Sequence, residues 1–135
     1  MKKTLSLLLL SMAIFTGCST PATPTTKFSS DFFQVEKPTQ DSVITSPVEI
    51  SGQALGTMFF EGTFPVTIED SNGQTLGSGT ATSTADWMTE KLIPFAVKIT
   101  FKTPTTKTGF IVLKNDNPSD LPENEHSAKF SISFK

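Results

Sequence analysis

Alternation of apolar and polar residues constrains the fold of this chain more than any other feature. Residues 48–54, 66–70, 94–102 and 130–135 each place apolar side chains at every second position. A period of two is typical of a β-strand that buries one face against a core. No helical period of about 3.6 residues follows residue 31. The pattern therefore predicts an all-β domain.

Turn-forming residues separate these segments and indicate how many strands there are. Asn72-Gly73 predicts a tight hairpin, because both residues tolerate a positive φ. Pro38, Pro104 and the polar loop 115–127 mark further breaks. About seven short strands at this spacing predict an antiparallel β-sandwich. The residues expected to face its core are Val48, Ile50, Val66, Ile68, Leu76, Trp87, Phe95, Val97, Ile99, Phe110, Val112, Phe130 and Ile132.

The first 17 residues have the pattern of an export signal. Met1-Lys2-Lys3 is positively charged, and the mostly apolar run at residues 5–15 is too short to span a bilayer permanently. Gly17-Cys18 is similar to the bacterial lipobox, which implies that Cys18 is lipidated, for example by palmitate, and begins the mature chain. The alternative is an ordinary signal peptide with an unmodified cysteine.

Three segments follow from this pattern. Residues 1–17 are predicted to be a lipoprotein signal peptide, residues 18–31 a flexible tether, and residues 32–135 the β-sandwich domain. We expect an exported protein that is held on a membrane by the lipid on Cys18. Ser19 resembles the signal for the outer membrane in a cell with two membranes; otherwise the protein would face outward from the cell membrane.

The charge of the chain argues against nucleic acid as a partner, and its cysteine content excludes an intrachain disulfide. The chain has a formal net charge of −2, and loss of Lys2 and Lys3 with the signal peptide makes it more acidic. The chain contains no arginine, so the clustered basic footprint that nucleic acid requires is missing. Cys18 is the sole cysteine, which leaves no intrachain disulfide. A membrane and an envelope protein or cell-wall component are the expected partners.

A short aromatic motif points to a family. Phe60-Glu61-Gly62, followed by Thr63-Phe64, is its most specific part. The other matching residues are Ser46-Pro47, Val48, Ile50, Gly52, Ala54, Asn72-Gly73, Trp87, Pro94-Phe95, Gly109 and Asn117-Pro118-Ser119. The run from Val43 to Phe134 thus resembles the immunoglobulin-like domain of bacterial spore germination proteins, although Gln40-Asp41 stands where a glycine is expected. The resemblance implies an immunoglobulin-like sandwich with a binding or assembly role at the cell envelope.

No constellation of catalytic residues is apparent, and we predict a protein without enzymatic activity or cofactor. His126 is the sole histidine and lies in a polar loop, with no recognisable serine or second histidine to pair with. Glu61 is expected to accept backbone N–H groups at a strand crossing, as part of the structural motif Phe60-Glu61-Gly62. The alternatives are an envelope hydrolase that uses Glu61 or Asp86, and a protease inhibitor that presents residues 58–63.

Acidic loops raise the question of calcium. Asp70-Ser71-Asn72-Gly73 has the start of a calcium loop but lacks its later ligands. A second loop holds the oxygen-bearing residues Asp116, Asn117, Asp120, Glu123 and Glu125. Acidic loops are usually solvated, so we predict no metal site.

Binding is therefore expected to use loops or an exposed strand edge. The candidate binding residues are Asp86, Trp87, Met88 and Asn117.

Overall fold

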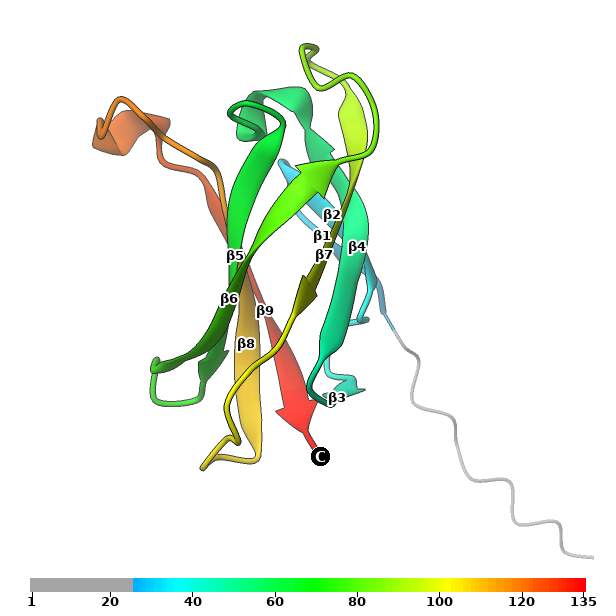
Figure 1. The fold of residues 1–135 in the computed structure, drawn as a ribbon, viewed down its shortest axis with the longest axis vertical. Coiled ribbons are helices and arrows are strands. Elements are labelled where there is room, and N and C mark those ends of the chain that lie inside the picture. The colour runs from blue at the N-terminus through cyan, green and yellow to red at the C-terminus, as the bar shows by residue number, and fades with distance from the viewer. Residues whose placement is uncertain (1–25) are drawn as a thin grey trace, which may run out of the picture.

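The computed structural model describes residues 26–135; the predicted signal peptide, Cys18 and most of the tether lie outside this range. The described chain is all-β (Figure 1). Its strands are β1 (Phe28–Ser29), β2 (Phe33–Lys37), β3 (Val43–Ile44), β4 (Val48–Leu55), β5 (Thr63–Asp70), β6 (Thr75–Ser83), β7 (Leu92–Ile99), β8 (Thr108–Lys114) and β9 (Ser127–Phe134). Two 3-10 turns, η1 (Gly56–Met58) and η2 (Pro122–Asn124), complete it.

These strands form one curled sheet in the order β1-β2-β4-β7-β6-β5-β8-β9-β3. The curl brings β1-β2-β4-β7 over β6-β5-β8-β9-β3, and the two layers are joined where Thr82 and Ser83 of β6 pair with Ala96 and Phe95 of β7. The predicted sandwich is confirmed. The described residues form nine strands where about seven were predicted, because β1 and β3 are two-residue edge strands. The β3–β9 pair is parallel, unlike the rest.

Aromatic side chains from both layers fill the core. The ring of Phe64 on β5 lies 5.4 Å from Phe33 of β2 and 5.0 Å from Phe95 of β7, both edge-on. Such contacts between layers stabilise a sandwich beyond simple area burial. Most predicted core residues are buried, and Trp87 and Val97 are partly buried against the core.

The predicted inward face of β8 was wrong. Phe110 and Val112 are half-buried on the outer face, whereas Ile111 and Leu113 are fully buried. Residues 110–113 are all apolar, so this strand has no alternation from which its inward face can be chosen. The outer face is partly covered because the Lys129 ammonium lies 4.3 Å from the centre of the Phe110 ring.

The sheet also begins earlier than residue 32. β1 lies within the predicted tether, and its Phe28 stacks on Phe130 of β9 with ring centroids 5.0 Å apart.

Among residues 26–135, no helix is long and apolar enough to cross a membrane.

The sandwich has two ends that carry different structures (Figure 1). The hairpin end comprises the β5–β6 turn at residues 71–74, the loop 100–107 and β3. The three-loop end, uppermost in Figure 1, comprises segment 56–62, loop 84–91 and loop 115–126. The chain enters the described region near the hairpin end, where the Gln40 N–H donates to the Thr26 carbonyl at 3.0 Å.

Candidate functional site

The motif Phe60-Glu61-Gly62-Thr63 forms a tight turn at the three-loop end. The N–H of Phe60 donates to the Thr63 carbonyl at 2.9 Å, and the N–H of Thr63 donates back at 3.0 Å. Glu61 and Gly62 both have positive φ angles, of 50° and 78°. Positive φ at both central positions is typical of a type I′ turn, which glycine favours.

Glu61 does not have the role that the sequence indicated. Its side chain is exposed and makes no hydrogen bond or ion pair with any described residue. Backbone groups stabilise the turn instead, since the Ser83 N–H donates to the Gly62 carbonyl at 2.9 Å. Met58 and Phe59 are buried, so within segment 58–63 it is Phe60 and Glu61 that are exposed at the turn.

Trp87 fixes loop 84–91 against this turn. A Cβ atom on Gly62 would lie 3.2 Å from indole atoms Cδ1 and Nε1 of Trp87, so the ring packs directly on the glycine. The Gly56 N–H donates to the Lys91 carbonyl at 2.9 Å, and a Cβ on Gly56 would clash with the Trp87 carbonyl. Segment 56–62 and loop 84–91 therefore pack together as one unit.

Loop 84–91 presents one apolar side chain to solvent. The Asp86 carboxylate accepts the Met88 N–H at 3.1 Å, and the Thr89 N–H donates to the Trp87 carbonyl at 2.7 Å. These bonds order the backbone on both sides of Met88. Its side chain nevertheless remains 76 % exposed.

Asn115 holds the third loop at its base. Its buried side-chain amide donates to the Asn124 carbonyl at 2.8 Å and accepts the His126 N–H at 2.8 Å. The His126 ring stacks on Phe32, with ring centroids 4.4 Å apart. These contacts order loop 115–126 although it lacks strands.

The tip of this loop is held by its own side chains. Asn117 Nδ2 donates to the Leu121 carbonyl at 2.9 Å, and Ser119 Oγ donates to Asn117 Oδ1 at 2.6 Å. Among residues 26–135, no three His, Cys, Asp or Glu side chains come close enough to hold a metal ion.

Two adjoining hollows lie between the three loops. The first, of about 330 Å³, lies between segment 56–62 and loop 84–91 and includes Trp87 and Met88. The second, of about 400 Å³, reaches loop 115–126 and includes Phe60 and Asn117. Thr57 and Phe59 line both. The hollows thus form one continuous uneven surface.

Exposed apolar side chains are concentrated at the same end of the sandwich as these hollows. The described residues contain four large apolar side chains that are exposed, and three of them lie in the three-loop end: Phe60 at 42 %, Met88 at 76 % and Leu121 at 49 %. Each comes from a different loop of the three-loop end. Met88 lines the first hollow and Phe60 the second, whereas Leu121 lines neither. The fourth, Val43, lies at the hairpin end.

The candidate binding residues thus come together in part. Trp87 and Met88 line the first hollow, Asn117 lines the second, and Asp86 lies in the same loop as Trp87. The sequence reasoning did not identify Leu121 as a surface residue. A lone leucine within the polar run 114–127 was a signal that could have found it.

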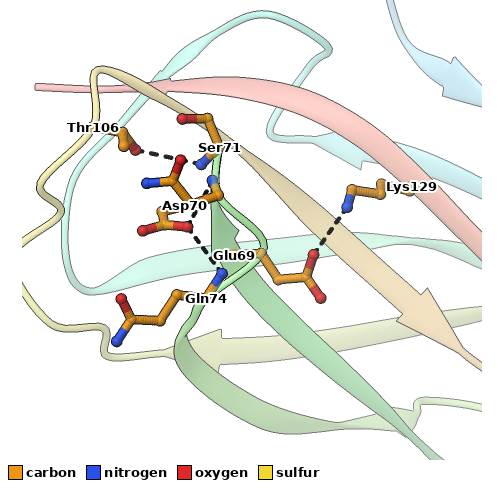
Figure 2. A network of polar contacts seen from close by, with 7 residues as sticks. Glu69, Asp70, Ser71, Gln74, Thr106 and Lys129 are labelled. Carbon is orange, nitrogen blue, oxygen red and sulfur yellow. Dashed lines mark hydrogen bonds and ion pairs between the residues drawn. The ribbon is translucent and has the colours of Figure 1, made fainter.

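The hairpin end is closed by a buried carboxylate (Figure 2). Asp70 is 1 % exposed, and its Oδ1 accepts the N–H groups of Asn72 and Gln74, each at 2.9 Å. The N–H of Ser71 donates to Thr106 Oγ1 at 3.4 Å. The Asp70 carboxylate therefore bonds its own turn, and the predicted hairpin at Asn72-Gly73 is confirmed.

Comparison with known protein families adds one finding. Residues 32–121 match the model of the immunoglobulin-like domain of bacterial spore germination. Searches of curated proteins and of solved structures find no match. The match covers most of the chain and all the motif residues from Phe60 to Trp87, and the curled two-layer sheet agrees with it. The chain therefore belongs to the family of immunoglobulin-like domains of bacterial spore germination.

Proposed function

We propose that this protein is a lipid-anchored, non-enzymatic module of the cell envelope that binds another envelope component through its three-loop end. The observation that carries the proposal is that Phe60, Met88 and Leu121, three of the four large exposed apolar side chains among residues 26–135, lie at the three-loop end. Met88 and Phe60 each line one of the two adjoining hollows there. Large exposed apolar side chains concentrated at one end of a domain are typical of interaction sites.

The order of the loops supports this proposal. The glycine contact of Trp87 and the hydrogen bonds of Asn115 hold the backbone of the three loops before any partner arrives. A surface that is already ordered loses less conformational entropy on binding than a flexible one. The exposed side chains are therefore presented in a binding-competent arrangement.

The position at which the chain enters the domain also supports the proposed function. Thr26 bonds to Gln40 near the hairpin end, and Cys18 lies only a few residues before Thr26. An extended chain spans at most about 3.5 Å per residue. A lipid on Cys18 would thus hold the hairpin-end half of the domain near the membrane, with the three-loop end directed away from it.

Membrane anchoring is tested by replacing the predicted lipid attachment site. We expect Cys18→Ala in the full chain to move the protein from the membrane fraction to the soluble fraction, because no acyl chain remains to hold it. Lys27→Ala, in the predicted tether, serves as the matched control and should stay in the membrane fraction. Retention of the Cys18→Ala variant on membranes would contradict the anchor.

Binding through the three-loop end is tested by photo-crosslinking in intact cells. A photoreactive amino acid at position 88 of the full chain should give a discrete crosslinked species. The same residue at position 43 serves as the control, since Val43 is also exposed but lies at the hairpin end. Crosslinks from position 43 alone, or none specific to position 88, would overturn the proposed surface.

A further inference from the structure

We propose that the partner of the three-loop end is a basic protein segment, in which lysine or arginine side chains flank an apolar residue. The inference rests on the proposed binding function and names the chemistry of the partner. It is carried by the uneven distribution of charge between the three loops and the rest of the domain, together with the exposed apolar side chains of the same loops.

The three loops carry most of the exposed negative charge of the domain. They hold a single basic residue, Lys91. Their carboxylates, all exposed, are Glu61, Asp86, Glu90, Asp116, Asp120, Glu123 and Glu125. Outside the loops, the described chain has eight lysines and six carboxylates, so its net charge has the opposite sign.

These loop carboxylates are largely without cationic partners. Within the described residues, the ion pair between Glu125 and Lys114, at 3.1 Å, is the one that involves the three-loop end. Glu61 lies in the turn on which Trp87 packs, Glu90 lines the same hollow as Trp87, and neither forms an ion pair among residues 26–135. An excess of like charge at one end of a domain gives that end a negative potential, which attracts a cationic partner.

The exposed apolar side chains of the three loops favour a partner that carries an apolar group beside its cations. Met88 adapts its shape to an inserted apolar group, and the exposed face of Phe60 offers a ring to a lysine or arginine cation. A basic protein segment supplies both the apolar group and the cation. Anionic polymers and anionic lipid headgroups carry the same sign as the loops and would be repelled.

Charge reversal tests the inference in the crosslinking system. The probe is the full chain with a photoreactive residue at position 88, and the crosslinked partner segments are sequenced by mass spectrometry. We expect those segments to contain an excess of lysine and arginine. Glu61→Lys with Glu90→Lys should lower the yield at least about tenfold, because rim charges control the rate of association.

The matched control reverses the same number of charges elsewhere. Glu36 on β2 and Glu49 on β4 are exposed, so Glu36→Lys with Glu49→Lys changes the net charge equally and should leave the yield unchanged. Asp116→Lys with Glu123→Lys, in loop 115–126, is a second test variant should the first misfold. Circular dichroism checks the fold of each variant.

The outcomes separate this inference from the function on which it rests. Crosslinks that form at position 88 but map to acidic or uncharged segments overturn the basic partner and leave the binding function standing. An unchanged yield in a folded Glu61→Lys/Glu90→Lys variant does the same. Absence of a crosslink specific to position 88 overturns both.

Discussion

Both ends of the sandwich are built from turns that carry carboxylates, but they use these groups in different ways. At the hairpin end, Asp70 is buried and its Oδ1 accepts hydrogen bonds from two backbone N–H groups (Figure 2). At the three-loop end, backbone bonds and Trp87 hold the turn, and Glu61 points to solvent without a bond. One end uses its charge to stabilise the fold, and the other leaves it available for a partner.

The largest effect on stability is expected at the hairpin end. Asp70→Ala removes the acceptor of two charge-assisted hydrogen bonds from a buried position. We expect the free energy of unfolding to fall by about 2–3 kcal/mol, measured by urea denaturation. Crosslinking from position 88 should remain unchanged at a temperature where the variant is folded. A loss below about 0.5 kcal/mol would show that the buried carboxylate does not stabilise the hairpin.

Substitution of two glycines with positive φ distinguishes the cost of backbone strain from the cost of crowding Trp87. Gly62 and Gly73 have φ angles of 78° and 81°, but a Cβ at Gly73 would meet no atom within 4 Å. We expect Gly62→Ala to cost about 2 kcal/mol and Gly73→Ala about 1 kcal/mol, because both variants are strained and only the first crowds the indole. The emission of Trp87, the sole tryptophan, should change in Gly62→Ala alone. Equal effects would contradict the glycine–tryptophan contact.

Asn115→Ala should have a smaller effect, confined to one loop of the three-loop end. The variant loses the bonds that join Asn115 to Asn124 and His126, so we expect about 1 kcal/mol of destabilisation. Hydrogen exchange in loop 115–126 should become faster, while exchange in the β5–β6 turn stays the same. Uniform acceleration through the whole domain would mean that Asn115 supports the global fold.

How far the sequence predicts this structure depends on the range of the interactions involved. Alternation identified the inward faces of β4, β5, β7 and β9, because each depends on a local pattern. It failed at β8, where residues 110–113 are apolar on both faces. There the inward side is set by non-local packing, since Gly109 lies against the Glu69 carbonyl and the Phe134 ring.

The sequence identified several residues of the candidate site, but it did not predict how the fold places them relative to one another. Trp87 and Met88 stood out as apolar residues in a polar segment. Their position at the same end of the sandwich as Asn117, in two hollows that share Thr57 and Phe59, depends on which strand ends the curl of the sheet brings together, and local pattern holds no information on that. The role of Glu61 was misjudged because Glu-Gly, unlike Asn-Gly, is a weak signal for a type I′ turn.

The most direct test of the difference between the two ends compares two substitutions of exposed apolar residues. Met88 and Val43 are 76 % and 63 % exposed, so a lysine at either position should change the free energy of unfolding by less than about 0.5 kcal/mol. The photoreactive residue is placed at position 121, on a different loop from Met88, and the yield of crosslinked partner is measured in intact cells. The account predicts that Met88→Lys abolishes this crosslink and Val43→Lys leaves it intact; an unchanged yield with Met88→Lys, or equal losses with both, would contradict it.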